Sequence, residues 1–161
     1  MAKTEGFLCE RVPIFDSLTK KPKDIRKNMR KRFEQQRKLG VISISEVKLP
    51  LKSRDELPPI LRALQHIYVT PELNEKVFRI LEEKVQKGKK KTGRYGMELW
   101  HILVLSVVRL GLDADYDRLD DFANHHKLIR QILGVETTCG EGKRFSRQSI
   151  QDNVSLLDEE T

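Results

Sequence analysis

Residues 97–111 read MELWHILVLSVVRLG and form the most apolar stretch of the chain. Apolar side chains occupy almost every position rather than one side of the helical repeat, which is typical of a helix buried all round. The stretch is too short to cross a bilayer, which requires about 20 apolar residues. We therefore predict a central buried helix over 97–110, ended by Gly111, with His101 as a core histidine whose hydrogen bonds are satisfied.

Two amphipathic helices are predicted immediately before it. The first begins near Asp55, a candidate N-cap, with Pro58 and Pro59 in the first turn, where a missing N–H costs little. The second begins at Thr70-Pro71. Their apolar faces recur at helical spacing: Ile60, Leu61, Leu64, Ile67 and Tyr68 in the first helix, and Leu73, Val77, Ile80, Leu81 and Val85 in the second. Because the connection is so short, we expect an antiparallel helix hairpin.

Three shorter helices are predicted after the central one. Residues 116–123 and 127–133 are amphipathic, and Gly134 ends the second of them. After a loop over 135–145, Ser146 is a candidate N-cap for a last helix. The inward side of that helix is formed by Ile150, Val154 and Leu157, at i, i+4 and i+7. These patterns predict an all-α fold, with a helix hairpin and a helix-turn-helix-like bundle from residue 97 onward.

Basic residues concentrate near the N-terminus, where residues 20–38 read KKPKDIRKNMRKRFEQQRK. Ile25, Met29 and Phe33 recur every fourth residue. This spacing predicts a helix over 24–38 with a thin apolar stripe and a cationic remainder.

The segment that follows, residues 41–51, is rich in β-branched side chains and is predicted to be extended. We accordingly divide the chain into a basic helical arm with an extended linker, residues 1–54, and a helical domain, residues 55–161.

The composition favours a polyanionic partner. The chain has 161 residues, a formal net charge of +7 and a pI near 9.5. Each Lys or Arg docked on a phosphate releases a condensed counterion, so such a chain binds nucleic acid readily. The first residues lack the apolar core of a signal peptide, and we expect no membrane association. Cys9 and Cys139 have no ligand-like Cys or His at metal spacing and are expected to be reduced thiols of a cytoplasmic protein.

The residues alone indicate no enzyme. Residues 88–93 have the glycine spacing of a P-loop, but Arg94 and Tyr95 stand where Lys and then Ser or Thr are required. Asp115 and Asp117 are expected to cap a helix and compensate its dipole rather than bind calcium. Metal-dependent phosphoryl transfer needs several carboxylates that converge on hard cations, whereas the acids here fall on exposed helical faces or at helix starts. We expect no catalytic residue, no metal ligand and no small-molecule substrate.

Three sets of side chains are candidates for contact with DNA. The sets are Arg26, Lys27, Arg30, Lys31 and Arg32 on the arm, Lys89, Lys90, Lys91 and Arg94 in the glycine-rich loop, and Arg147, Gln148 and Gln151 on the last helix. In a major groove, Arg bonds guanine and Gln bonds adenine through two hydrogen bonds each. The negative charge of Asp152 argues against this assignment, because it would lie near the phosphates of the DNA. The alternatives are a solvated linker for the loop and an ordinary polar surface for the last helix.

Three long runs resemble the N-terminal region of bacterial insertion-sequence transposases of the DDE type. They are KLPLKSRDELPPILRALQHIYVTPELNEKVFRILEEKV (48–85), GKKKTGRYGMELWHILVLSVVRLGLDADYDRLDDFANHHKLIRQILGV (88–135) and QSIQDNVSLLDEE (148–160). The chain is most similar to the group termed ISNCY, the insertion sequences not classified yet. The resemblance covers residues 26–161.

The resemblance implies a function in DNA transposition. Such enzymes cut and join DNA with a DDE carboxylate triad and Mg²⁺ on an RNase H-like domain downstream of this region, and their N-terminal helices serve DNA binding and subunit assembly. No triad residue can be assigned here, so we expect a truncated element or a first reading frame. Its partner would be double-stranded DNA of transposon ends, with possible homo-oligomers, and it would have no catalytic activity or cofactor of its own. The alternatives are a dimerisation module without DNA contact and a non-functional remnant.

Overall fold

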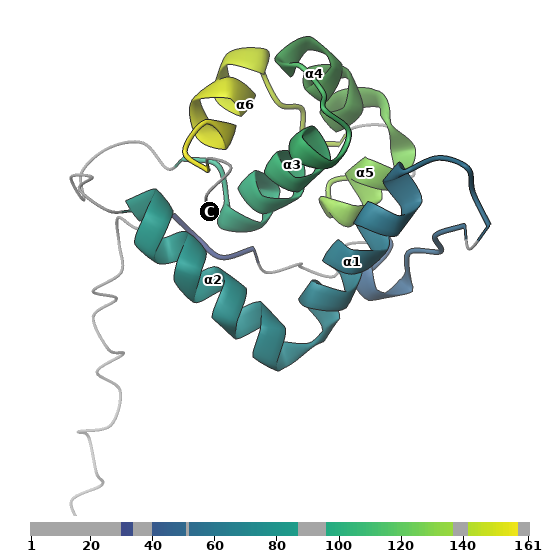
Figure 1. Ribbon diagram of the computed structural model, residues 1–161, viewed down its shortest axis with the longest axis horizontal. Helices are drawn as coiled ribbons and strands as arrows, with labels where there is room; N and C mark the ends of the chain where they lie inside the picture. The colour runs from purple at the N-terminus through teal and green to yellow at the C-terminus, as the bar shows by residue number, and fades with distance from the viewer. Residues whose placement is uncertain (1–29, 34–39, 51, 87–95, 137–141, 158–161) are drawn as a thin grey trace, which may run out of the picture.

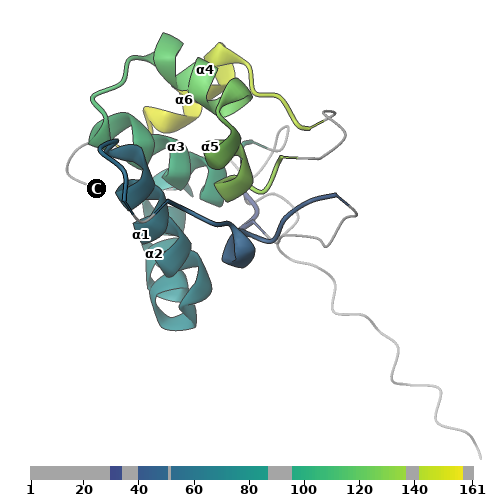
Figure 2. The ribbon, with the colours of Figure 1, turned by 90° about the vertical axis from the view of Figure 1, so that its right-hand side faces the viewer.

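The computed structural model describes residues 30–33, 40–50, 52–86, 96–136 and 142–157. Within these ranges the chain is all-helical, which confirms the predicted fold class, and contains no strand. The elements are a 3₁₀ turn η1 (Ile44–Glu46) and the helices α1 (Leu57–Val69), α2 (Pro71–Gln86), α3 (Leu99–Gly111), α4 (Tyr116–His125), α5 (Lys127–Ile132) and α6 (Arg147–Val154). Figures 1 and 2 show α4 and α6 at the end of the molecule opposite the junction of α1 and α2.

Helix α3 is the predicted central helix, and its burial is confirmed. Trp100 is fully buried, and its indole N–H donates to the carbonyl oxygen of Ile132 at 2.8 Å, so even this polar atom is paired inside the core. The helix ends at Gly111, as predicted, but Gly111 does not have a left-handed backbone; the positive φ in this turn belongs to Asp113 (φ 45°). Gly111 has a packing role instead: a Cβ there would lie 2.6 Å from Cδ1 of Ile60, so α1 approaches this turn only because it has no side chain.

Helices α1 and α2 are joined by Thr70 alone, whose extended backbone (φ −89°, ψ 108°) turns the chain. Figure 1 shows the pair opening as a V from this corner, so the helices do not lie side by side as the predicted antiparallel hairpin would. The N-cap of α1 is Glu56 rather than Asp55, although the Asp55 carboxylate still accepts a hydrogen bond from the Leu57 N–H at 3.2 Å. Both prolines lie in the first turn, as predicted.

The buried side of α2 differs from the prediction at one position. Ile80 was expected to face the core, but 49% of it is exposed, while Phe78 is only 2% exposed. Leu81 and Val85 are buried as expected. The V-shaped corner turns α2 so that Phe78 faces the protein, and a periodic pattern with apolar residues on two neighbouring faces does not distinguish these orientations.

The three later helices begin at side-chain caps. Asp115 caps α4 by accepting from the Arg118 N–H at 2.7 Å, and Ser146 caps α6 by accepting from the Ser149 N–H at 3.3 Å, both as predicted. His126 caps α5 through Nδ1, and Gly134 (φ 68°) follows that helix. Helices α3, α4 and α6 each contact the other two. The short turn of a helix-turn-helix motif is replaced between α4 and α6 by α5 and a loop.

Residues 30–33, which we call the strap, lie outside regular secondary structure, so the helix predicted over 24–38 is wrong at these four residues. The other residues of that helix lie outside the described ranges. The Lys31 carbonyl accepts a hydrogen bond at 3.1 Å from the N–H of Leu99, the first residue of α3. The first N–H groups of a helix have no partner within the helix, so the strap satisfies one of them. Phe33 packs between Tyr68 and His101, with ring centroids at 6.4 and 5.2 Å.

The predicted extended linker also joins the core where it is described. Residues 44–46 form η1 rather than extended chain, and Ile44 is fully buried. The side-chain amide of Gln65 on α1 donates to the carbonyl oxygens of Ile44 and Val47 at 2.7 and 3.0 Å. This part of the chain is therefore held against α1 by both apolar burial and hydrogen bonds.

His101 is a core histidine, as predicted, but only one of its ring nitrogens is satisfied. It is 1% exposed, and Nε2 donates to the Leu133 carbonyl oxygen at 3.0 Å. Its Nδ1 has no hydrogen-bond partner and lies 3.7 Å from a carboxylate oxygen of Glu98. Burial, together with the positive charge of Lys143, lowers the pKa of His101 from 6.5 to about 3, although the hydrogen bond to Leu133 acts in the opposite direction.

The buried His101 predicts a pH dependence of stability. Between pH 6.5 and about 3 the unfolded chain binds a proton at this position and the folded chain does not, so the free energy of unfolding should decrease as the pH falls through this window. The contribution is on the order of 1.4 kcal/mol per pH unit. Urea unfolding of His101→Gln at several pH values should show a shallower slope, and the exposed His125→Gln should not. Equal slopes for His101→Gln and the wild type would contradict this account.

Candidate nucleic-acid interface

The structure describes residues of two of the three groups into which the predicted DNA-contacting residues fall. Arg30, Lys31 and Arg32 lie in the strap, whereas Arg147, Gln148 and Gln151 lie on α6. Outside the described residues lie Arg26, Lys27, Lys89, Lys90, Lys91 and Arg94. The structure therefore bears on the first two groups, and these turn out to be built differently.

Arg30 is used inside the fold. Its Nη1 donates to the Met97 carbonyl oxygen at 3.3 Å and to the side-chain oxygen of Asn153 on α6. The guanidinium also packs against Gly96, where a Cβ would lie 2.8 Å from Cζ of Arg30. Burial lowers the pKa of Arg30 from its usual value. This side chain connects the beginning of α3 to the end of α6, and its position is fixed by those contacts.

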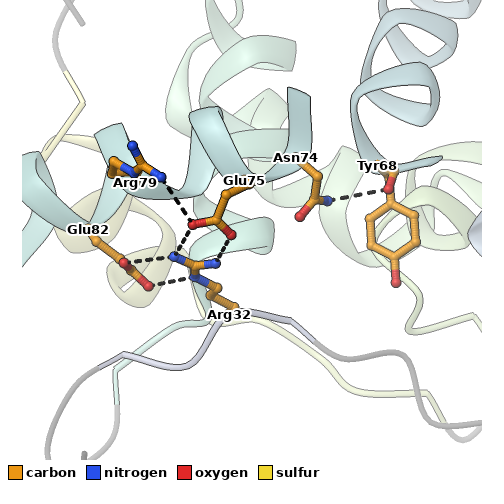
Figure 3. A network of polar contacts seen from close by, with 6 residues as sticks. All are labelled: Arg32, Tyr68, Asn74, Glu75, Arg79 and Glu82. Carbon is orange, nitrogen blue, oxygen red and sulfur yellow. Dashed lines mark hydrogen bonds and ion pairs between the residues drawn. The ribbon is translucent and has the colours of Figure 1, made fainter. Parts of the chain in front are cut away.

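Arg32 is held by two carboxylates of α2, as Figure 3 shows. Its Nη1 lies 2.6 Å from Glu75 Oε2 and its Nε lies 2.7 Å from Glu82 Oε1, while Nη2 donates to both carboxylates. These bonds raise the pKa of Arg32, and the guanidinium in turn lowers the pKa of Glu75. A phosphate could engage this guanidinium only in competition with two carboxylates. Of the strap's basic side chains, Lys31 alone is classed as exposed.

Helix α6 presents its polar residues outward. Ile150, Val154 and Leu157 are buried, as predicted, and the outward residues Arg147, Gln148 and Gln151 are all exposed. Two carboxylates engage this exposed face. Arg147 pairs with Asp117 of α4 at 2.9 Å, and the Gln148 amide donates to Asp152 at 2.7 Å.

Two asparagines hold α6 in place. The Asn124 side chain on α4 accepts from the Phe145 N–H and donates to the Phe145 carbonyl oxygen, both at 2.9 Å. At the other end, Asn153 accepts from Arg30 and donates to the Ser149 carbonyl oxygen at 2.6 Å. The orientation of α6 is thus set by α4 on one side and by the strap on the other, besides its apolar contacts with the core.

The loop before α6 is organised by Arg130 of α5, which is 7% exposed. Its guanidinium pairs with Glu136 at 2.6 Å and donates to the carbonyl oxygens of Val135 and Lys143. Gly142 lies so close that a Cβ there would meet Nη2 of Arg130 at 2.2 Å. This buried cation, paired and hydrogen-bonded, brings the two ends of the loop together.

The sequence reasoning missed Lys143 and Arg144. Both are exposed, both directly precede α6, and neither forms an ion pair with any residue that the structure describes. Lys143 Nζ lies over the Phe145 ring at 5.4 Å from its centroid. The run GKRFSR (142–147) contains three basic residues around the beginning of the helix, whereas the loop prediction over 135–145 assigns no DNA contact to Lys143 or Arg144. Together with Arg147 they make the beginning of α6 basic.

Two features are absent from the described part of the chain. No three or more His, Cys, Asp or Glu side chains gather there closely enough to hold a metal ion. Among the same residues no helix has both the length and the apolar composition of a membrane span. In comparisons with known protein families, with curated proteins and with solved structures, no match to this chain was found.

The Asn124 contact predicts a selective loss of order in α6. Asn124→Ala removes both partners of the Phe145 backbone, and an unsatisfied buried backbone group costs about 1–3 kcal/mol. Hydrogen exchange should therefore accelerate in α6 far more than in the core of α3, and urea unfolding should show lower stability. Asn74→Ala, which removes a single hydrogen bond to Tyr68 at 3.3 Å, is the control and should leave α6 protected. Unchanged protection of α6 in Asn124→Ala would show that the apolar contacts alone position it.

Proposed function

We propose that this chain binds double-stranded DNA through α6 and adjacent basic segments, as the N-terminal part of an insertion-sequence transposase. The observation that carries the proposal is the outward face of α6, a capped helix whose exposed side holds Arg147, Gln148 and Gln151. These are side-chain types that read base edges in a major groove. The resemblance of the chain to insertion-sequence transposases points to the same function and to transposon ends as the DNA.

The packing of α3, α4 and α6 supports docking of α6 in a groove. In a helix-turn-helix unit, the recognition helix rests on two other helices and exposes its first residues to the bases. Here α6 rests on α3 and α4 and exposes Arg147 and Gln148 in its first turn. The connection to α4 is longer than a helix-turn-helix turn, so the likeness concerns the arrangement of three helices rather than the motif itself.

The distribution of charge supports different contributions to DNA binding from the described residues and from the rest of the chain. Acidic and basic side chains are nearly balanced in the described residues, so most of the net charge of +7 lies elsewhere, in segments that include residues 20–29 and 89–94. Phosphate contacts from such segments bind any sequence, whereas base contacts from α6 select among sequences. The proposal assigns neither Arg30 nor Arg32 to DNA, because both are engaged inside the fold.

The proposal assigns this chain no catalytic step and no cofactor, and it places the chain with the DNA in a bacterial cytoplasm. Assembly of the parent transposase is a second candidate function, and one observation favours it. Val69, the last residue of α1, and Ile80 on α2 are 53% and 49% exposed. Contact with a second subunit would remove these apolar side chains from water, which is favourable. Sedimentation of the wild type and of Ile80→Lys would measure this role separately from DNA binding.

Binding to duplex DNA should weaken steeply as salt is added. If about five phosphates are neutralised, a plot of log K against log salt should have a slope of roughly −4 to −5, because each contact releases condensed counterions. Fluorescence anisotropy with a labelled duplex at several salt concentrations measures the slope. An absence of binding at low salt would reject the proposed function, and salt-independent binding would reject its electrostatic basis.

The basic residues before α6 should contribute to that slope. Lys143→Ala combined with Arg144→Ala should weaken binding to specific and random duplexes alike and reduce the slope by up to about 2, which corresponds to two phosphate contacts. The matched control is Lys76→Ala combined with Lys84→Ala, which removes the same charge from α2, a helix to which the proposal assigns no DNA contact, and should change the slope little. Equal effects of the two double variants would indicate that only net charge matters.

A further inference from the structure

We propose that Asp117 is a positioning residue that orients Arg147 to read a guanine. The inference rests on the proposed function and deepens it, because it names one base contact and the residue that prepares it. Asp117 lies in the first turn of α4, and Arg147 is the first residue of α6. The two elements are held together independently by Asn124 and Phe145, so the pair sits on a fixed framework.

The geometry leaves the reading edge of the guanidinium open. Nε of Arg147 lies 2.9 Å from Oδ1 of Asp117, and Nη2 donates to Oδ2 at 3.1 Å. Asp117 therefore occupies the side of the planar fork formed by Nε and one N–H of Nη2. Within the described residues, both N–H groups of Nη1 and the second N–H of Nη2 have no hydrogen-bond acceptor. The edge formed by Nη1 and Nη2 is suited to donate two parallel hydrogen bonds to O6 and N7 of guanine.

The pair contributes little to folding, so orientation is its main physical effect. The side chains of Arg147 and Asp117 are 58% and 70% exposed, and ion pairs in such positions add little stability. A long side chain that is already held in one orientation loses less conformational entropy when it binds. Free Arg147 would contact phosphates and bases alike, whereas the held guanidinium presents a fixed plane to a base.

The same arrangement occurs one residue later. The Gln148 amide donates to Oδ1 of Asp152 at 2.7 Å, which leaves its oxygen and its second N–H, the acceptor and donor that adenine requires. Asp152 would oppose DNA binding if it acted only as a charge. In this geometry Asp117 is paired with the cationic Arg147, whereas Asp152 is hydrogen-bonded to a neutral amide and keeps its negative charge.

Asp117 could instead weaken DNA binding by holding Arg147 away from the DNA, and the two roles predict different results. If Asp117 merely withdraws Arg147 from DNA, removing the carboxylate raises affinity for every duplex and leaves base preference unchanged. If it orients Arg147, removing it lowers the preference for guanine at one position. The control is Asp121→Ala, which removes a carboxylate from the same helix, where Asp121 pairs with His125 at 2.9 Å rather than with Arg147.

The experiment begins with selection of binding sites from a randomised duplex library by the wild type and by Arg147→Ala. Arg147 reads the position at which the wild type prefers guanine and Arg147→Ala does not. The selected duplex is then compared with the same duplex carrying 7-deazaguanine, which lacks the N7 acceptor, at that position. A whole bidentate base contact is worth roughly 5- to 150-fold in affinity, and 7-deazaguanine, which keeps O6, removes one of its two hydrogen bonds. The wild type and Asp121→Ala should therefore lose part of this range, and Arg147→Ala should lose almost nothing.

Asp117→Ala tests the inference by removing the carboxylate. Asp117→Asn is a second test, which removes the negative charge but keeps nearly the same side-chain shape. Both should retain the circular dichroism of the wild type, and both should show a loss on 7-deazaguanine several-fold smaller than that of the wild type. A loss equal to that of the wild type would overturn the role of Asp117. A wild type that binds DNA without any base preference would overturn it too, yet would leave salt-dependent DNA binding intact. Absence of binding to any duplex would remove the proposed function as well.

Discussion

The burial of α3 on every side is the constraint on which the rest of the structure depends. A helix that is apolar almost all round is stable in water only if other elements cover each of its faces. Here α1, α2, α4 and α6 all contact it, α5 receives the Trp100 indole hydrogen bond, and the strap crosses its first residue. The V of α1 and α2 follows from the same requirement, because one connected pair of helices covers two sides of α3 by opening around it.

The strap shows how a basic segment can be drawn into such a core. Its backbone satisfies an N–H at the beginning of α3, Phe33 fills space beside His101, and Arg32 balances two glutamates of α2. The charge of Arg32 is therefore paired with carboxylates inside the fold rather than with a partner molecule. Other positive charge lies at the beginning of α6, where Lys143 and Arg144 are exposed.

The candidate site depends on contacts between elements that lie far apart in the sequence. Asn124 and Asp117 on α4 meet the residues around the beginning of α6, and Arg30 of the strap meets its end. The exposed face proposed to read bases is therefore formed by residues of α6, but its orientation is set by α4 and the strap. A perturbation of α4 or of the strap is expected to reach this face without touching its exposed residues.

The sequence by itself determined the helices α1 to α6 and the caps of α4 and α6, because these follow from interactions within a few residues. The apolar run of α3, the caps Asp115 and Ser146, and the inward residues of α6 were all correctly predicted from local spacing. Only the tertiary structure decided that Ile80 faces outward and that residues 30–33 are not helical. It alone also decided that Arg30 and Arg32 serve the fold and that Asp117 meets Arg147. The physical reason is that these outcomes depend on how whole helices pack, and the partner of a charged side chain is set by proximity in space rather than by spacing along the chain.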